Sequence, residues 1–385
     1  MKNFLEIESQ YTSGVYAKRD IVVVRGHGAY LYDEEGREYI DCVGGQGAAN
    51  LGHAHPAIAE AIAVQAETLI SCPEMFYNDS RASLLSRLAT LLPGAWRVFL
   101  CNSGTEAVEA AIKFARASTG RSDIVAAMRG FHGRTYGALS ATWNKRFREP
   151  FEPLVPGFSH VPYNNLEKLE GAVTRDTAGV ILEVIQGEGG VHPGTAEYLQ
   201  GAHAICRERG ALFILDEVQT GFGRTGKMLA LEHHGLEPDL LCLAKSMAGG
   251  VPMGAVLIGE RVGEIPTGSH GSTFGGNPLA AAASLAALEV LQNEGLPERA
   301  AELGEYLLEG LGEIRSPLVR DVRGKGLMVG IEIKQKVAPY LQALMEGGVL
   351  ALPAGLTVIR LLPPLVISKA QLDRVVQAFE EVLSS

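Results

Sequence analysis

A lysine at the end of a strongly apolar stretch is the first residue whose surroundings could support chemistry. Lys245 follows the apolar residues 240–244, and the small residues 246–250 come after it. An amine that emerges from a buried strand must lose its charge, find a partner or form a covalent bond. An uncharged lysine amine is the form that makes Schiff bases with carbonyl compounds. Taken alone, the pattern also fits a lysine whose amine simply reaches solvent.

An aspartate ends another apolar stretch earlier in the chain. Asp216 follows residues 213–215, and a carboxylate at the mouth of a central strand is the partner that keeps a pyridine nitrogen protonated. An apolar strand that ends in Asp-Glu also resembles a nucleotide site, and residues 221–227 read G-x-x-x-x-G-K. However, Met228 stands where such a loop needs a Ser or Thr, and the acidic strand precedes the loop. The sequence therefore disfavours a nucleotide site.

A third stretch has the features of a phosphate site. Residues 102–106, Asn-Ser-Gly-Thr-Glu, follow a short apolar run and open a helical pattern, with Ser103 and Glu106 in capping-box positions. The free N–H groups and positive dipole at a helix N-terminus favour phosphate, and the Ser and Thr hydroxyls add donors. The ordinary alternative is a well-capped helix that binds no ligand.

Other candidate side chains also follow short apolar runs. Phe131 could stack on a ring, and Arg134 could hold a carboxylate, although core packing and a surface position are the ordinary alternatives. Residues 186–190 and 271–278 are glycine-rich, and the second of these segments opens a helix. The paired histidines have no third His or Cys in a coherent zinc pattern, so we expect no metal.

Short β-branched runs alternate with helical patterns up to about residue 276, which predicts an α/β fold around a mainly parallel central sheet. From Asn277 onward the residue pattern changes. It predicts two helices, a strand region at 319–333 and a closing helix from Lys369. We expect a large domain over 49–276 and a smaller α+β domain over 277–385. Residues 1–48 are expected to join the smaller domain.

The amino-acid composition and net charge exclude several classes of protein function. A net charge of −10 argues against a nucleic-acid binder, because phosphate backbones demand clustered Lys and Arg. The most apolar late stretch, 349–367, carries Arg360 and two prolines, so no membrane span is expected. No secretory pattern follows Met1, and the five cysteines form no CxxC pair. Reduced thiols and a cytoplasmic location are the expectation.

The joint order of these motifs resembles one family, the class III pyridoxal-phosphate (PLP) aminotransferases of fold type I. The resemblance covers nearly the whole chain. It rests on NSGTEA at 102–107, FHGRT at 131–135, QGEGG at 186–190, LDEVQTGFGRTGK at 215–227, LAKSMAGG at 243–250 and STFGGNPLA at 272–280, with NLGHAHP at 50–56 and RGKGLMVGIE at 323–332 in the flanks.

The resemblance implies a set of cofactor-binding residues. Lys245 would hold PLP as a Schiff base and carry the proton, Asp216 would pair with the pyridinium nitrogen, and Gln219 would lie near the ring oxygen. Phe131 would stack on the ring. The phosphate would be bound by Ser103, Gly104 and Thr105, and by Thr273 reaching over from a partner subunit of a homodimer.

The resemblance also implies substrate-binding residues. Arg134 would hold the carboxylate distal to the reacting amine, and Ser272 would line the substrate site. Glu188 and Arg360 would form a gate: the glutamate masks the arginine when an ω-amino donor binds, and releases it for the α-carboxylate of glutamate. Gln46 departs from the Tyr or aliphatic residue that relatives often have at this pocket, which affects fine specificity.

Within the family, the chain looks most like acetylornithine aminotransferases, and more narrowly like lysine-biosynthetic enzymes whose substrate is linked to a small amino-group carrier protein. Segments 13–29, 38–45, 141–151 and 349–367 carry that likeness. The implied reaction moves a terminal amino group between an N-blocked lysine or ornithine and 2-oxoglutarate. The alternatives are an acetylornithine or ornithine aminotransferase acting on free substrates, or an aminomutase of the glutamate-1-semialdehyde type.

Overall fold

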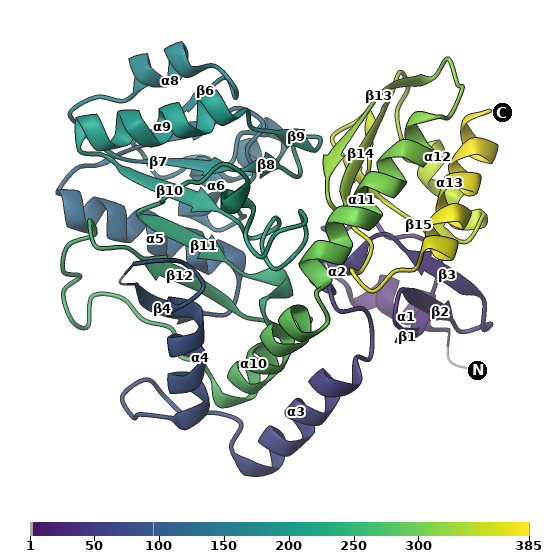
Figure 1. Cartoon of the computed structure of the whole chain (residues 1–385), viewed down its shortest axis with the longest axis horizontal. Coiled ribbons are helices and arrows are strands. Elements are labelled where there is room, and N and C mark those ends of the chain that lie inside the picture. Colours follow the sequence, from purple (N-terminus) through teal and green to yellow (C-terminus); the bar gives the residue numbers. More distant parts are fainter. Residues whose placement is uncertain (1–2, 95, 385) are drawn as a thin grey trace.

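The computed structural model describes residues 3–94 and 96–384, and its largest element is a seven-stranded sheet (Figure 1). The strand order is β4-β12-β11-β10-β7-β5-β6, and β12 runs antiparallel to both of its neighbours. All other strands are parallel to one another, as expected. Their bounds are β4 Arg97–Cys101, β5 Asp123–Ala127, β6 Phe158–Val161, β7 Thr177–Glu183, β10 Leu212–Asp216, β11 Leu240–Leu243 and β12 Gly254–Ile258.

Both faces of this sheet are buried, which explains why its strands read as unbroken apolar runs. Alternate residues of β10 pack into two different cores. Phe213 and Leu215 join Leu199 of helix α9 (Ala196–Arg209) on one face. Ile214 joins Ile112 of helix α5 (Gly104–Thr119) on the other. The two helices therefore cover opposite faces.

The strand directions gather the candidate residues at one edge. Strands β4, β5, β7, β10 and β11 all run the same way, so the residues that follow them lie at the carboxyl edge of the sheet. Strand β7 ends at Glu183, and Ile185–Gln186 forms the separate short strand β8, paired with β9 (His192–Pro193). The hydroxyl of Tyr163 donates to the carbonyls of Glu183 (2.7 Å) and Val184 (3.1 Å), so these carbonyls bond to a side chain at the break. The loops at this edge form the usual ligand crevice of such sheets.

The sheets of the C-terminal part form a second lobe beside the large sheet (Figure 1). An antiparallel sheet has the order β13-β14-β17-β16, and another contains β1-β2-β3-β15. In the latter, β15 pairs in parallel with β3, so the N-terminal segment is joined to the C-terminal part. This pairing supports our proposal that 1–48 and 277–385 form one domain and 49–276 the other. The strands are β1 Val23–His27, β2 Tyr30–Asp33, β3 Glu38–Asp41, β13 Val319–Lys325, β14 Met328–Ile333, β15 Val349–Leu350, β16 Leu352–Ala354 and β17 Val358–Leu361.

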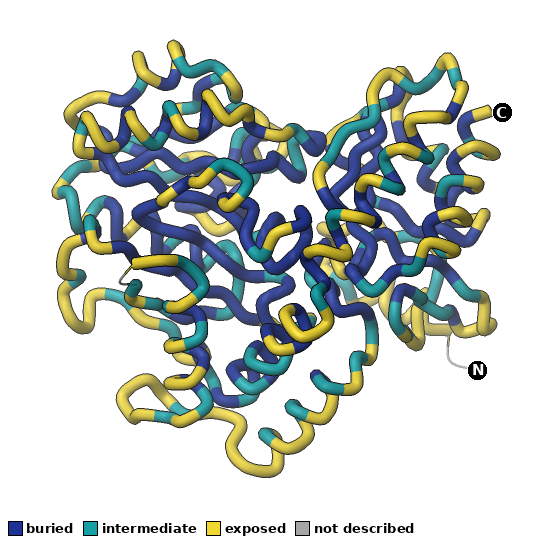
Figure 2. The backbone as a smooth tube through the Cα atoms, in the orientation of Figure 1, coloured by how far each residue is buried: buried dark blue, intermediate teal, exposed yellow. Residues whose placement is uncertain are grey.

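Three of the four described helices after Asn277 (α10, α11 and α13) lie close to their predicted positions, and α12 was not predicted. Their bounds are α10 Pro278–Asn293, α11 Leu296–Gly312, α12 Ala338–Glu346 and α13 Lys369–Leu383. The buried parts of the tube in Figure 2 include most of the large sheet and the strands β14 and β17, whereas β1 and β13 are exposed or partly exposed. The remaining helical segments are α1 Phe4–Tyr11, α2 Gly44–Gly47, α3 Pro56–Thr68, α4 Asp79–Ala89, α6 Tyr136–Ala141, α7 Lys145–Arg148, α8 Leu166–Ala172, η1 Glu149–Phe151, η2 Ala230–His233 and η3 Lys245–Ala248.

Helix length and hydropathy bear on membrane insertion. Across the described ranges 3–94 and 96–384, none of the helices is long and apolar enough to span a bilayer.

Candidate active site

A cavity of about 1040 Å³ opens at the carboxyl edge of the large sheet and extends to the C-terminal part. The structure brings ten of the twelve predicted site residues together in its wall. Ser272 and Thr273 are absent from the described residues that line it. The ten that line it are Ser103, Gly104, Thr105, Phe131, Arg134, Glu188, Asp216, Gln219, Lys245 and Arg360.

Lys245 lies where β11 ends and the short helix η3 begins. Its φ of +46° is in the left-handed region, which costs a non-glycine residue on the order of 1–3 kcal/mol and is typical of functional positions. Burial lowers the pKa of its amine, and the charges of Glu188 and Asp216 only partly oppose that effect. Its amine makes no hydrogen bond or ion pair with any other described residue. A cavity-lining amine in this state can react with a carbonyl carbon.

Asp216 ends β10, and its carboxylate lines the same cavity. One oxygen, Oδ1, accepts from the backbone N–H of Val218 (3.0 Å), and Oδ2 lies 2.8 Å from Nδ1 of His132. Burial alone would lower the pKa of His132, but the hydrogen bond and charge of Asp216 outweigh burial and raise it. His132 therefore holds the Asp216 carboxylate in place, and both side chains are buried.

The next residue, Glu217, points away from the cavity because side chains alternate at the end of a strand. Its carboxylate accepts from the backbone N–H groups of Ala230 and Leu231, each at 2.7 Å. Residues 221–227 form turns and no helix follows them directly. Glu217 is thus bonded inside the fold, and the glycine-rich loop lacks the helix that a nucleotide-binding loop precedes, which disfavours the nucleotide alternative.

Glu183, at the end of β7, connects two loops of the site. Its Oε1 accepts from the N–H of Phe131 and its Oε2 from the N–H of Gly187, both at 3.0 Å. Burial raises the pKa of this carboxyl to about 7. The loop with the predicted ring-stacking residue and the loop with Glu188 therefore share one buried anchor.

The N-terminus of α5 has the geometry predicted for a phosphate seat. Ser103 caps the helix by accepting from the N–H of Glu106 (3.3 Å), and Glu106 in turn accepts from the N–H of Asn102 (2.5 Å). The N–H groups of Gly104 and Thr105 have no hydrogen-bond partner within the described residues. A Cβ on Gly104 would lie 2.6 Å from Val218, so the turn needs a glycine.

Arg134 stands at the exposed mouth of the cavity. Its guanidinium carbon lies 4.4 Å from the ring centroid of Phe147 and 5.9 Å from that of Phe131. No described carboxylate lies within ion-pair distance of it, so the charge is held by aromatic faces and stays available to a ligand. Phe147 belongs to α7, whose Lys145 and Arg146 are exposed.

Glu188 and Arg360 form an ion pair of 2.6 Å between Oε1 and Nη2, inside the cavity. Arg360 lies on β17 and is almost completely buried, whereas about a third of the Glu188 side chain is exposed. The second amino group of Arg360 donates to Oε1 of Gln219 (3.0 Å). An arginine masked in this way can exchange one carboxylate for another.

Of the two predicted residues outside the cavity wall, Ser272 contacts a residue next to it. Ser272 accepts a hydrogen bond from Asn102 (2.9 Å), next to the α5 N-terminus. The role expected for Thr273 involves a partner subunit and stays a prediction. Gln46 lines the cavity with a positive φ of +59°.

Sequence reasoning missed His132 and Glu183 as members of the site. Glu183 ends β7 and His132 follows β5, both at the same sheet edge as Asp216, and that position is the signal that could have identified them. It also missed the segment around Tyr16 and Arg19, which lines the cavity from the N-terminal part. That contribution depends on long-range packing.

The residues of the cavity fit PLP. A reactive amine, a carboxylate held by a histidine and a helix N-terminus with free N–H groups match an aldehyde, a pyridine nitrogen and a phosphate respectively. The described residues contain no cluster of His, Cys, Asp and Glu that could hold a metal ion.

Comparison with known proteins identifies the family. The model of the class III aminotransferases matches residues 12–383. A [LysW]-aminoadipate semialdehyde transaminase of Deinococcus radiodurans is 54% identical over 99% of this chain and 90% of its own. An acetylornithine aminotransferase of Methanothermobacter thermautotrophicus is 46% identical over 100% of this chain and 99% of its own.

Solved structures agree with the sequence comparison. The ornithine aminotransferase of Toxoplasma gondii superposes with a TM-score of 0.95 at 34% identity, covering 99% of this chain and 94% of that one. Another structure of that enzyme contains PLP at its active site. The fold is therefore that of the fold type I enzymes, and this chain belongs to the class III aminotransferases, a family of PLP-dependent enzymes.

Proposed function

We propose that the enzyme transfers a terminal amino group between an N-blocked lysine or ornithine, linked to a carrier or acetylated, and the glutamate/2-oxoglutarate couple. The masked Arg360 is the observation that carries this proposal. An enzyme that alternates between a substrate with no carboxylate beside its amine and one with such a carboxylate needs a cation that can be covered and uncovered. The two most similar relatives reported above are named for carrier-linked and acetylated substrates.

Bound PLP supplies an electron-withdrawing ring that takes up charge developing at the substrate carbon. In our proposal Lys245 holds the cofactor and moves the proton, Asp216 keeps the ring nitrogen charged, and Gln219 lies near the ring oxygen. Phe131 packs on the ring. Ser103, Gly104 and Thr105 hold the phosphate at the α5 N-terminus.

Substrate choice tests the proposal directly. Purified enzyme would be assayed with N-acetylornithine, N-acetyllysine and carrier-linked lysine, each with and without 2-oxoglutarate. We expect turnover of at least one N-blocked substrate that strictly requires 2-oxoglutarate. Isomerisation of glutamate-1-semialdehyde without 2-oxoglutarate would instead support the aminomutase alternative.

Replacing each of the two arginines of the cavity should affect the two half-reactions differently. We expect Arg134→Ala to weaken both half-reactions, because the distal carboxylate is held in each. Arg360→Ala should chiefly raise the KM for glutamate and 2-oxoglutarate, by about tenfold or more, the effect of one lost charge-assisted hydrogen bond. Single-turnover measurement of each half-reaction checks this. Equal damage to both half-reactions by Arg360→Ala would remove the gate from the mechanism.

We also propose that the enzyme is a homodimer in the cytoplasm, with Thr273 completing the partner's phosphate site and Ser272 near its substrate. Arg81 donates to the carbonyl of Cys72 (2.9 Å), which anchors an apolar segment that is nevertheless exposed. An ordered apolar segment of this kind fits a subunit interface. Its exposed residues are Ile70, Met75, Phe76 and Tyr77, with Phe274 beside Ser272 and Thr273. All five cysteines are free, as expected for a reducing compartment.

We further propose that a carrier protein binds this enzyme, and the charges of α7 support this proposal. Lys145 and Arg146 are exposed, and Phe147 between them and Arg148 contacts the Arg134 guanidinium at the cavity mouth. The sequence alone would add the basic residue Arg224 to this rim, and that expectation is wrong. Arg224 is fully buried and donates to the carbonyl of Leu327 (2.9 Å).

Salt should distinguish carrier-linked from small substrates. Exposed rim charges act on association rate and are screened over about 8 Å at physiological ionic strength. We expect kcat/KM for a carrier-linked substrate to fall as salt rises, while that for an acetylated substrate changes little. Charge reversal at Lys145 and Arg146 should reproduce the loss at low salt. A better rate with the small substrate at every salt concentration would mean that no carrier is used.

A further inference from the structure

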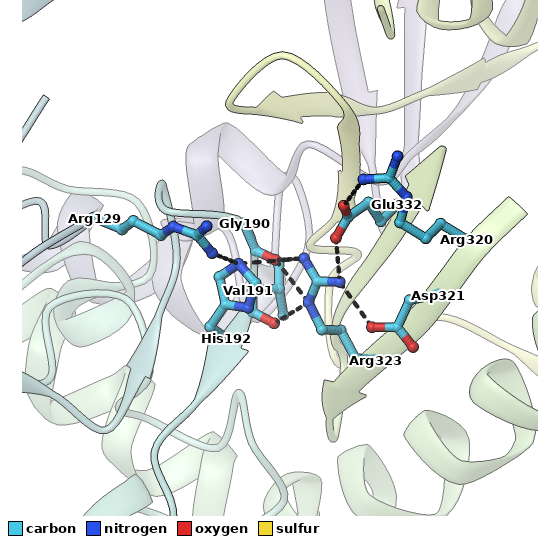
Figure 3. A network of polar contacts seen from close by, with 8 residues as sticks. All are labelled: Arg129, Gly190, Val191, His192, Arg320, Asp321, Arg323 and Glu332. Atoms are coloured by element: carbon cyan, nitrogen blue, oxygen red, sulfur yellow. Dashed lines mark hydrogen bonds and ion pairs between the residues drawn. The ribbon is translucent and has the colours of Figure 1, made fainter. Parts of the chain in front are cut away.

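Arg323 belongs to the C-terminal sheet, yet most of its hydrogen bonds are made to a turn of the large domain (Figure 3). Its Nε donates to the carbonyls of Gly190 and Val191, both at 3.0 Å, and Nη2 donates to Gly190 at 2.6 Å. The remaining group, Nη1, pairs with Asp321 and Glu332, both at 2.8 Å. The guanidinium is therefore held on its own sheet by two carboxylates while its other N–H groups hold the turn.

The turn that it holds carries Glu188. On the large-domain side the turn is anchored at Gly187, whose N–H donates to Glu183 (3.0 Å). On the other side it is anchored at Gly190 and Val191 by Arg323. Glu188 lies between these two anchors, so its position depends on both.

The register of the C-terminal sheet places the two arginines in one row. Arg323 of β13 is paired with Gly330 of β14, and Gly330 is paired with Arg360 of β17. Cross-strand partners project their side chains from the same face of a sheet. Arg323 therefore holds the backbone of the turn, and Arg360 holds the Glu188 side chain, from the same face.

Gly330, between the arginines, makes room for the turn. A Cβ at this position would lie 2.9 Å from the Cβ of Val191, closer than real side chains approach. Val191 is itself fully buried with a φ of +54°, a conformation that a β-branched residue adopts only when its surroundings enforce it. The turn is thus docked on the sheet in a strained conformation.

His192 lies between Arg323 and Arg129 of the large domain, with its Nε2 at 3.4 Å and 3.0 Å from them (Figure 3). Burial, followed by the charges of the two arginines, lowers the pKa of His192 to about 4. The histidine is therefore neutral at physiological pH, and it accepts from the arginines without adding charge to the turn.

We infer that Arg323 is a positioning residue that fixes the Glu188 turn to the sheet bearing Arg360, and so sets how completely Arg360 is masked. This inference rests on the proposed gate. It assigns Arg323 a part in choosing between the two substrates, although Arg323 is absent from the cavity wall among the described residues.

Replacing Arg323 tests the inference, and Arg320 provides a matched control. Arg320 lies on the same strand and pairs with the same Glu332 (3.0 Å), but it is exposed and makes none of the hydrogen bonds to the turn. In the PLP-loaded enzyme, Arg323→Gln should lower kcat/KM for the ω-amino donor about tenfold, the effect of losing charge-assisted hydrogen bonds to the turn. The glutamate half-reaction should stay within about twofold, and Arg320→Gln should change neither.

A second readout does not depend on turnover. Hydrogen exchange of a peptide covering residues 187–192 should become faster in Arg323→Gln and stay unchanged in Arg320→Gln. If Arg323→Gln does not fold, Arg323→Lys keeps the charge for Asp321 and Glu332 but loses the planar fork that reaches both carbonyls. The same substrate difference is then expected in Arg323→Lys.

A Glu188→Gln background separates the inference from the proposed gate. With the gate carboxylate gone, Arg323→Gln should have no further effect on the ratio of the two half-reactions. A full effect of Arg323→Gln in that background, or equal loss in both half-reactions, overturns the inference alone. If Glu188→Gln by itself leaves the ratio unchanged, the gate fails and the inference fails with it.

Discussion

Lys245→Ala should lower turnover by about 10³-fold or more, because proton transfer by a positioned group contributes about 10²–10⁴-fold and the covalent attachment of the cofactor is lost as well. The structure explains why no neighbour can substitute. The amine is unpaired among the described residues, and burial lowers its pKa. Borohydride reduction followed by peptide mass spectrometry should label residue 245 in the wild type and leave the variant unlabelled.

Two control variants make this result specific. Lys227→Ala removes an exposed lysine of the nearby loop and should leave both labelling and turnover unchanged. Lys245→Arg keeps a cation at the site but cannot form the covalent link, so it should be as inactive as Lys245→Ala. Near wild-type transamination by Lys245→Ala would show that the cofactor is held elsewhere.

The large sheet and the edge at which the candidate site residues gather could be predicted from the sequence because both depend on local patterns. A strand buried on both faces must be apolar throughout, so the polar residue that ends it, such as Asp216 or Lys245, stands out. Parallel strands then bring these residues to one edge without any knowledge of loop structure. The same reasoning could have reached His132 and Glu183.

Contacts between distant segments could not be predicted in this way. Nothing in the local sequence distinguishes the buried Arg224 from a surface arginine, because its partners come from residues more than a hundred positions away. Arg323 is similar: its role depends on the register of three strands and on a turn 132 to 133 residues earlier. Patterns of neighbouring residues do not encode such pairings.

Asp216→Ala should reduce turnover by about 10²–10³-fold, because removing one partner of a buried ion pair costs ~3–5 kcal/mol, or about a factor of ten in rate for each 1.4 kcal/mol. The variant should still attach the cofactor at Lys245, since the amine and the phosphate seat are unchanged. Asp216→Asn keeps the shape but not the charge, and should be impaired nearly as much. Absorbance of the bound cofactor and single-turnover rates with glutamate measure the two effects separately.

Asp239→Asn is the matched control for this prediction, because it separates loss of stability from loss of cofactor chemistry. Asp239 is also a buried aspartate, directly before β11, and its carboxylate accepts from the N–H of Phe213 (2.7 Å) and pairs with Arg261 (2.8 Å). It lies beside the start of β10, whereas Asp216 lies at the end of that strand. Asp239→Asn should lower the melting temperature and leave the rate of the folded enzyme unchanged. An unimpaired half-reaction in Asp216→Asn would mean that the charge at this position, held by His132, does not act on the ring.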